Sequence, residues 1–349
     1  MKNIFRILIG FIVVGALLLG AMLGWFYFQV WKKPFLTEKQ SKEVLIPTGS
    51  TYQDLMHQIA QWETRADTAV FGLFAQQKNL HNNIKPGRYV IPANYTMNEV
   101  INLLRSGNQT PVRVTFNHVN NKEELAGKIA RQIEADSVSI LREINNANRS
   151  WPDKINKQNN RAVFIPNTYE FYWNTSADRW VERMIVEYHS FWSDDRREKA
   201  KAINLCPHRV SILASIVERE TIKRDEMAKV AGLYLNRLRD NWKLQSDPTV
   251  IFAIQQSDPT FSPRRVLYDD LTFDSPYNTY LYSGLPPGPI GFPSVTAIEA
   301  VLNAEQHNYY YMCANPDVPG YHSFARNNRE HEINKQRYVQ WLQKQGIRR

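Results

Sequence analysis

The sequence predicts an α+β protein that begins with a transmembrane helix and continues into a small α+β module and a larger mixed α/β domain. An apolar stretch runs from Ile7 to Val30, two strand–turn–helix units follow within residues 43–110, and helical periodicity dominates the part after residue 160. With 349 residues and 43% hydrophobic content, the chain is long enough for two or three domains with a sizeable core.

The stretch Ile7–Val30 contains no charge and a single strongly polar residue, Gln29. It exceeds the ~20 residues that a bilayer core requires, whereas the apolar region of a cleaved signal peptide runs for only ~7–15 residues. Aromatic residues that suit a membrane interface follow at Trp25, Phe26, Tyr27 and Trp31. We therefore expect residues 1–31 to form an N-terminal tail and an uncleaved transmembrane anchor.

Basic residues flank this stretch on both sides, so positive-inside counting does not decide the orientation. A short N-terminal tail followed by one span and the whole globular part fits a single-pass protein whose N-terminus is cytoplasmic. The net charge of +9 comes without a basic run, a zinc motif or an aromatic RNA-binding signature. The charge pattern thus argues against nucleic acid and favours anionic cell-wall or membrane surfaces. Cys206 and Cys313 are too few to imply a disulfide framework, and their redox state stays open.

The next region, residues 43–110, repeats one pattern twice. EVLIPTGSTYQDLMHQIAQ indicates a strand, a glycine turn and a helix that opens near Ser50 or Thr51. NIKPGRYVIPANYTMNEVINLLRSGNQ indicates a second strand and a helix that Thr96 caps and that ends near Gly107. The resulting α+β module resembles the LysM-like region that precedes the catalytic part of some cell-wall enzymes.

Residues 111–160 contain a strand at 111–116 and polar helical segments without visible chemistry, and we expect them to form a connecting subdomain. A second domain, residues 161–349, opens with the aromatic stretch FIPNTYEFYW. The elements expected there are helices around 177–203, 208–223 and 227–238, a helix that Asp247 caps, a rigid Pro- and Gly-rich loop at 275–293, a helix from Ser294, two strands that flank NPDVPG, and a C-terminal helix.

One acid interrupts the apolar face of the second of these helices. Leu213, Ile216, Val217 and Glu220 stand at i, i+3, i+4 and i+7, so Glu220 occupies a position that calls for a hydrophobic residue. Glu218 is rotated off this stripe. An i, i+4 pair between Glu220 and Arg224 would be a purely structural explanation. The alternative is that apolar surroundings raise the pKa of Glu220 and keep it protonated as a general acid.

The order of several motifs resembles the endolytic murein transglycosylase family (MltG/YceG-like). The matching stretches are FIPNTYEF, LASIVERET, VAGLYLNRL, LQSDPTVIFAI, YNTYLYSGLPPGPI and YHSFA, together with the anchor and the LysM-like module. The resemblance covers close to the whole chain. It implies a lysozyme-like helical site in which Glu220, the second glutamate of an E-x-E motif, is the catalytic acid.

The resemblance also implies an activity, which is cleavage of the β-1,4 bond between MurNAc and GlcNAc in nascent glycan strands to leave 1,6-anhydroMurNAc ends. This chemistry needs no metal and no cofactor. The expected partners are peptidoglycan, the bacterial inner membrane and cell-wall synthases, and termination of strand elongation is the expected role. We also expect the catalytic domain to be periplasmic or otherwise extracytoplasmic.

Several further residues are candidates for contacts with the sugar through hydrogen bonds and ring stacking. They are Glu218, Gln245, Ser246, Tyr277, Asn278 and Tyr280. Glu218 points across the helix from Glu220 and has a structural alternative. The spacing of His307, Cys313, His322 and His331 matches no zinc pattern, so no metal site is expected.

Two other functions fit the same sequence. A hydrolytic muramidase would cleave the same bond with water, and product mass would distinguish it. A non-catalytic peptidoglycan-binding scaffold for cell-wall synthesis is the third possibility, although a pure binding protein has no use for an unpaired buried acid.

Overall fold

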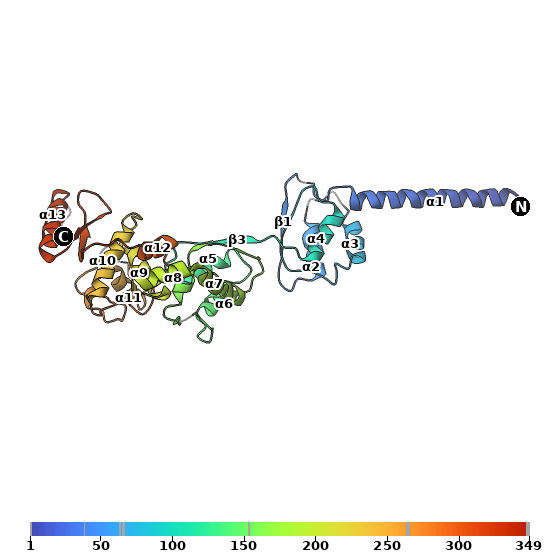
Figure 1. Cartoon of the computed structure of the whole chain (residues 1–349). Helices are drawn as coiled ribbons and strands as arrows, with labels where there is room; N and C mark the ends of the chain where they lie inside the picture. Colours follow the sequence, from blue (N-terminus) through green and yellow to red (C-terminus); the bar gives the residue numbers. More distant parts are fainter. Residues whose placement is uncertain are drawn as a thin grey trace. The chain divides into compact units, whose positions relative to one another are not determined.

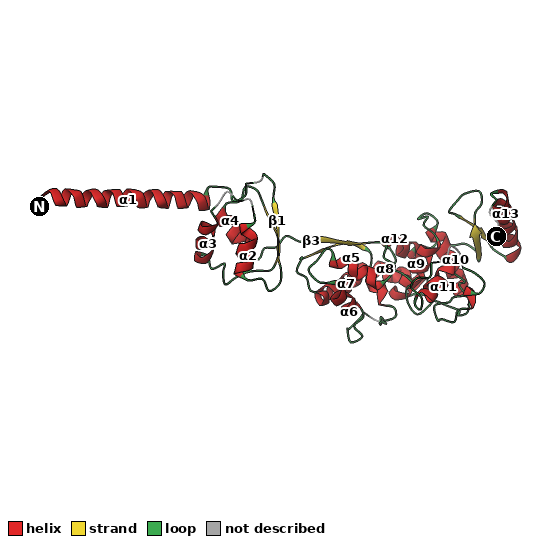
Figure 2. Ribbon diagram, turned by 180° about the vertical axis from the view of Figure 1, so that it is seen from behind, coloured by secondary structure: helices red, strands yellow, loops and turns green. Residues whose placement is uncertain are grey.

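The computed structural model describes residues 2–37, 39–62, 64, 67–152, 154–262 and 266–346. It contains both helices and strands, which confirms the predicted α+β class (Figure 2). The chain forms two compact units. Unit 1 contains the residues up to Val114 and two short returning segments, Gln132–Glu134 and Glu170–Thr175. Unit 2 contains the segments Thr115–Arg131 and Ala135–Tyr169 and the chain from Ser176 onward.

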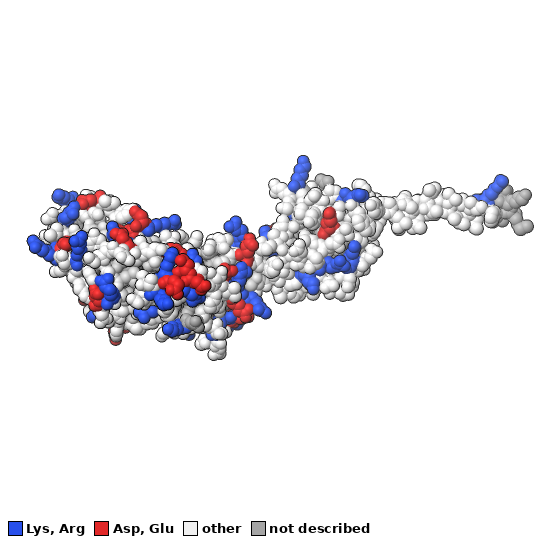
Figure 3. Space-filling model, viewed as in Figure 1, with Lys and Arg blue, Asp and Glu red and all other residues white. Residues whose placement is uncertain are grey.

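Helix α1 (Lys2–Trp31) opens unit 1 (Figure 1). Its segment Phe5–Trp31 contains an 18-residue window with a mean hydropathy of 2.6 and is the one helix of the described chain that is long and apolar enough to cross a membrane. Side chains such as Phe11 and Leu17 are 74% and 69% exposed, and the helix is free of Lys, Arg, Asp and Glu between residues 7 and 30 (Figure 3). Such an exposed apolar surface fits a membrane anchor.

The C-terminal end of α1 packs against the body of unit 1. Val30 has no exposed surface, and the rings of Phe26 and Trp31 lie 6.3 and 5.2 Å from the ring of Phe74. The apolar helix of 27 residues is about 40 Å long, whereas the hydrocarbon core of a bilayer is ~30 Å thick. The last two turns of α1 are therefore part of the unit 1 core as well as the end of the anchor.

We expect two truncations to behave differently for this reason. Removal of residues 1–23 should give a protein that is soluble without detergent and melts like the full chain. Removal of residues 1–31 also deletes Val30 and Phe26, and a buried valine side chain alone contributes about 1.5–3 kcal/mol. The melting temperature of unit 1 should then fall by roughly 5 °C or more, as measured by calorimetry. Equal melting temperatures for the two truncations would contradict this role of the helix end.

Unit 1 is built around a two-stranded antiparallel sheet. Strand β1 (Lys42–Ile46) pairs with β2 (Gly87–Ile91), with Val44 opposite Tyr89. Three helices cover it: α2 (Tyr52–Ala60), α3 (Thr68–Gln77) and α4 (Met97–Ser106). The core is formed by buried residues from all of these elements and from the end of α1.

Local capping explains where these helices begin and end. Thr51 and Thr96 each form a capping box, with Asp54 and Glu99, and confirm the predicted starts of α2 and α4. Gly107 ends α4 with a positive φ of 73°, a conformation that glycine adopts without strain. Helix α3 lay outside the sequence predictions.

Unit 2 is mainly helical. Its elements are α5 (Lys122–Ala130), α6 (Ser137–Ile144), the 3₁₀ helix η1 (Asn160–Val163), α7 (Ala177–Phe191), α8 (Asp194–Ala202), α9 (Pro207–Glu220), α10 (Met227–Arg239), α11 (Asp247–Gln255), the 3₁₀ helix η2 (Asp270–Thr272), α12 (Val295–Leu302) and α13 (Asn328–Lys344). Strand β3 (Val112–Phe116) pairs with β4 (Asn167–Phe171), and each of these two strands has residues in both units. Within unit 2, β5 (Tyr311–Ala314) pairs with β6 (His322–Ala325). The predicted helix after Ser294 and the predicted strands on both sides of NPDVPG are confirmed.

Helix α9 lies at the centre of unit 2. Every residue from Val210 to Val217 is buried, because α8, α10, α11 and α12 all contact this helix (Figure 1). The loop before α12 packs closely against the segment before η1, since a Cβ at Gly288 would stand 2.3 Å from the carbonyl oxygen of Gln158. The amide of Ile290 donates to Ser215 on α9 at 3.0 Å. The end of α9 is thus held from several sides.

The structure corrects three sequence predictions in this unit. The single helix expected at 177–203 is two helices, because Ser193 caps a new one through the amide of Arg196. Helix α9 ends at Glu220 and not at residue 223, since Thr221 is extended, with φ −137° and ψ 135°. Asp247 does not cap α11, because Ser246 takes the N-cap position and Asp247 is the first residue of the helix. Cys206 and Cys313 are both free thiols.

Candidate active site

Glu220 is the last residue of α9, and it follows a fully buried stretch of that helix. The side chain is half-buried, so it combines protein surroundings with access to solvent. Arg224 lies beyond the helix end, and the i, i+4 geometry of a helical ion pair therefore does not exist here. A helical ion pair with Arg224 therefore does not explain Glu220. Glu220 does lie at the end of the apolar stripe, as predicted.

Two hydroxyl groups contact the carboxylate of Glu220. Ser246 Oγ donates a hydrogen bond to Oε2 at 3.0 Å, and Ser246 itself is 1% exposed. The hydroxyl of Tyr234, a buried residue of α10, is within hydrogen-bonding reach of both Glu220 and Ser246. Burial raises the pKa of Tyr234 well above its ordinary value, so this phenol stays a hydrogen-bond donor. The carboxyl group is therefore fixed in orientation.

The surroundings favour the neutral form of Glu220. Burial raises its pKa above the ordinary value of 4.5, and the nearby carboxylate of Asp247 raises it further. His322 and the hydrogen bonds from Ser246 and Tyr234 oppose this shift without cancelling it. The carbonyl end of the α9 dipole also disfavours a negative charge at this position. Glu220 thus has the properties of a carboxylic acid that can donate a proton near neutral pH.

The raised pKa predicts how stability depends on pH. The folded protein binds a proton at Glu220 more tightly than the unfolded chain does, so this residue destabilises the fold increasingly as the pH rises above about 4.5. Glu220→Gln should be more stable than the wild type at pH 7–8, and the difference should disappear near pH 4. Denaturant unfolding of both proteins across this range measures the gap. A gap that grows toward low pH would mean that the pKa of Glu220 is lowered.

Hydrogen bonds fasten the loop before α11 to the long loop before α12. Thr279 accepts from the amide of Ser246 at 3.0 Å, and its carbonyl accepts from the amide of Gln245 at 3.1 Å. Thr249 contributes a hydroxyl contact of 2.8 Å to Thr279. Gln245 has a positive φ of 49°, a strained conformation for this residue, and an exposed side chain. The network places Ser246 against Glu220 and leaves Gln245 open to solvent.

Tyr280 also lies close to Glu220. Its hydroxyl donates to Asp247 Oδ1 at 2.6 Å, and the charges of Asp247 and Glu220 both raise the pKa of Tyr280 after burial. The residue is half-buried. Three predicted residues, Gln245, Ser246 and Tyr280, are thus brought together beside Glu220.

Asn278 has a different place from the one predicted. It has no exposed surface, and its Nδ2 donates to the carbonyl oxygens of Leu271 and Phe273 at 3.0 and 2.8 Å. Its Oδ1 accepts from the amide of Tyr280 at 2.9 Å. Both polar atoms of this side chain are engaged inside the loop, which leaves neither of them open for the predicted contact with a sugar. Asn278 holds the loop that carries Tyr280.

Tyr277 points to another part of the unit. Its ring packs on Phe252 with centroids 4.9 Å apart, and its hydroxyl reaches the carbonyl oxygen of Gln158 at 3.4 Å. Both partners stand away from the hydrogen bonds around Glu220. The structure therefore does not bring Tyr277 together with Ser246 and Tyr280.

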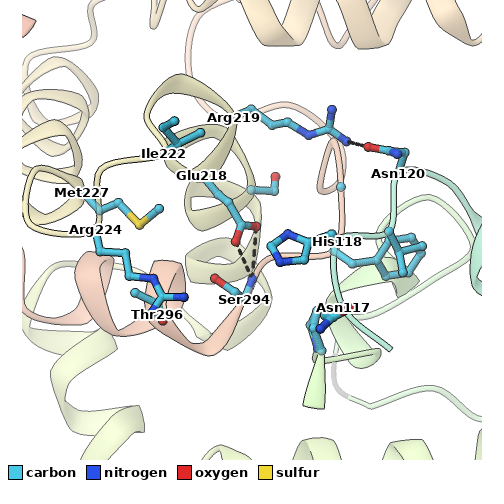
Figure 4. Close-up of a pocket in the computed structure, with 15 residues that line it drawn as sticks. Asn117, His118, Asn120, Glu218, Arg219, Ile222, Arg224, Met227, Ser294 and Thr296 are labelled. Atoms are coloured by element: carbon cyan, nitrogen blue, oxygen red, sulfur yellow. Dashed lines mark hydrogen bonds between the residues drawn. The ribbon is translucent and has the colours of Figure 1, made fainter. Parts of the chain in front are cut away.

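Glu218 lies on the opposite face of the helix end, as the helical spacing predicted. Both of its carboxylate oxygens accept from the amide of Ser294, at 3.3 and 3.2 Å, and Ser294 is the N-cap of α12 (Figure 4). A carboxylate at a helix N-terminus is stabilising there. This contact supports the structural alternative for Glu218.

Sequence reasoning missed Tyr234 and the pair of His322 and Glu226. Glu226 is 5% exposed and accepts from the amide and the Nδ1 of His322, at 2.7 and 2.8 Å. This pair fixes the imidazole ring that acts to lower the pKa of Glu220. Tyr234 fits the apolar face of a helix, and the one signal available in the sequence is that a buried tyrosine hydroxyl requires a hydrogen-bond partner.

Comparisons with known proteins find relatives that match most of this chain. Residues 44–337 match the model of the YceG-like family. A protein of Bacillus subtilis (strain 168) named endolytic murein transglycosylase is 26% identical over 321 residues, which cover 86% of this chain and 87% of that protein. A protein of the same name from Streptococcus pneumoniae serotype 2 (strain D39) is 25% identical, and the match spans 86% of this chain and 59% of that longer protein. A crystal structure of a yceG-like protein from Listeria monocytogenes covers 85% of this chain with a TM-score of 0.54 and 23% identity, which shows a common fold.

Proposed function

The chain belongs to the YceG-like family, and on this premise we propose that it is a membrane-anchored endolytic murein transglycosylase with Glu220 as its catalytic acid. Family membership confirms the resemblance that the sequence motifs indicated. The observation that supports the assignment of Glu220 is its setting, which is a half-buried carboxyl group with a raised pKa, held by Ser246 and Tyr234.

One carboxyl group is sufficient for the proposed reaction. Protonated Glu220 donates its proton to the glycosidic oxygen as the bond between this oxygen and C1 of MurNAc breaks. The resulting carboxylate then takes the proton of the C6 hydroxyl of the same sugar, and the C6 oxygen forms a bond to C1. The products are a GlcNAc hydroxyl end and a 1,6-anhydroMurNAc end, and Glu220 is again protonated.

Asp247 gives a specific reason to keep hydrolysis as a second candidate. Ordinary glycosidases use two carboxyl groups, and the charge of Asp247 acts directly on Glu220. A water molecule activated by Asp247 would convert the same cleavage into a muramidase reaction. The hydrogen bond from Tyr280 occupies one oxygen of Asp247, which leaves less of this carboxylate available to accept a proton from water and favours the transglycosylase.

The remaining parts of the chain have proposed roles that follow from this function. Residues 1–31 anchor the protein in the bacterial cell membrane with a cytoplasmic N-terminus. Residues 43–110 form a LysM-like module that contacts glycan. Residues 111–160 connect this module to residues 161–349, which form the extracytoplasmic catalytic domain with a lysozyme-like helical site. This arrangement would let the enzyme meet nascent strands beside cell-wall synthases and terminate their elongation.

Mass spectrometry of glycan fragments tests the proposal. The full-length protein in detergent is incubated with uncrosslinked glycan strands, and the products are compared with those of a muramidase. Anhydro ends lack the mass of one water relative to reducing ends, and cleavage inside long strands identifies an endolytic enzyme. Products with reducing ends would show that the protein is a hydrolytic muramidase. Strands that stay intact would favour a non-catalytic binding protein.

A further inference from the structure

A cavity lies at the end of α9, on the Glu218 side of the helix. Its volume is about 590 Å³, which is the size of a small-molecule site. The segment Asn117–Asn120 forms one wall, and residues after the helix end form the other, including Arg224 (Figure 4). Glu218 and Ser294 lie between the walls, and Glu220 does not line the cavity.

The wall formed by Asn117–Asn120 is held rigidly. Lys128 Nζ donates to the carbonyl oxygens of Asn117 and His118, at 2.8 and 3.1 Å. The amide and the side chain of Asn120 both donate to Glu124, at 2.9 and 3.0 Å. These bonds fix the backbone from behind and leave the side chains of Asn117 and His118 directed to the cavity (Figure 4). A wall that is ordered before binding lowers the entropic cost of holding a ligand.

The charges of the cavity favour an anion. Two guanidinium groups line it, and Arg219 is fixed by a hydrogen bond to Asn120 Oδ1 at 2.9 Å. Among the described residues, Glu218 is the only acid in the lining, and it is already engaged by the amide of Ser294. Arg224 is exposed, and within the described part of the chain its side chain makes no ion pair or hydrogen bond. Figure 4 shows Arg219 and Arg224 at opposite ends of the cavity, and each guanidinium group is suited to a carboxylate.

The same cavity also offers apolar and amide contacts. Ile222 is 84% exposed on its rim, and Met227 and Val119 contribute further apolar surface. The side chains of Asn117 and Thr296 provide hydrogen-bond partners for amide groups. A ligand that combines carboxylates, peptide amides and small apolar side chains would match all of these features. Such a ligand is a short acidic peptide.

We propose that this cavity binds the acidic stem peptide attached to the muramic acid residues of the strand, an inference that rests on the proposed function. A helix with its side chains is ~10–12 Å across, and an extended peptide spans ~3.3–3.6 Å per residue. Three or four peptide residues therefore reach from a sugar at Glu220 around the end of α9 to Arg224. The cavity then makes the enzyme selective for strands that still carry their peptides.

The experiment compares two substrates, which are glycan strands with stem peptides and the same strands after an amidase has removed the peptides. We expect the full-length wild type to prefer the peptide-bearing strands. Arg224→Gln should lower kcat/KM on them about tenfold, the effect of one charge-assisted hydrogen bond, and leave cleavage of bare strands unchanged. Arg224→Lys should recover part of the loss. Arg142→Gln removes the same charge outside the cavity and serves as the matched control.

Equal losses on both substrates, or no loss on either, would overturn the inference. Titration calorimetry of the free stem peptide with the full-length protein tests the peptide site independently of cleavage. The wild type should bind the peptide and Arg224→Gln should bind it about tenfold more weakly. If the wild type cleaves neither substrate but still shows this difference, the proposed function fails and the peptide site stands. If cleavage occurs without peptide binding, the site fails and the function stands.

Discussion

Glu220→Gln should abolish turnover while the protein still folds and binds glycan. The amide keeps the shape of the side chain and can still accept the hydrogen bond from Ser246, but it has no proton to donate. General acid catalysis typically contributes 10²–10⁴-fold, and one residue here serves both the donating and the accepting step. We therefore expect a loss near 10⁴-fold in kcat, measured as the rate at which new strand ends appear.

Glu218→Gln is the matched comparison, because it makes the same change two residues away on the other face of the helix. An amide oxygen can still accept from Ser294, so the variant should lose less than about tenfold. The melting temperatures of both variants establish that the fold is intact. A large loss for Glu218→Gln together with full activity of Glu220→Gln would reverse the assignment within the E-x-E motif.

The features that the sequence predicted correctly depend on local patterns. A charge-free stretch is sufficient to recognise α1, and the cap residues Thr51 and Thr96 determine where two helices begin. The position of Glu220 follows from a 3.6-residue period, which places an acid among hydrophobic residues. These signals are contained within segments of ten to thirty residues, so no tertiary contact is needed to interpret them.

The remaining features depend on contacts between distant segments. His322 reaches the site from β6, about a hundred residues after Glu220, and no local pattern indicates which acid holds it. Tyr234 was hidden because a tyrosine fits an apolar stripe as well as a leucine does. The burial of Val30 was hidden because a membrane-spanning helix and a core helix have the same composition. In each case the sequence fixes the residue type, and packing decides its role.

Asn278→Ala should lower stability strongly. The substitution leaves two part-buried carbonyl oxygens and one part-buried amide without their partner, and each loss costs about 1 kcal/mol or more. A total of roughly 3 kcal/mol or more corresponds to a fall of about 6–12 °C in the melting temperature of a unit of this size. Asn303→Ala, which changes an exposed asparagine, should stay within about 0.5 kcal/mol of the wild type.

The activity of Asn278→Ala decides between the two roles considered for this residue. Measured well below its melting temperature and per folded molecule, cleavage should fall only modestly, because Ser246 is still held by Thr279 and can still contact Glu220. A sugar contact would give the opposite result, with weak cleavage at an unchanged melting temperature. That result would place Asn278 in the wall of the glycan site. It would also require the loop to open in solution far enough to expose the Asn278 side chain, whose three hydrogen bonds all lie within residues 271–280.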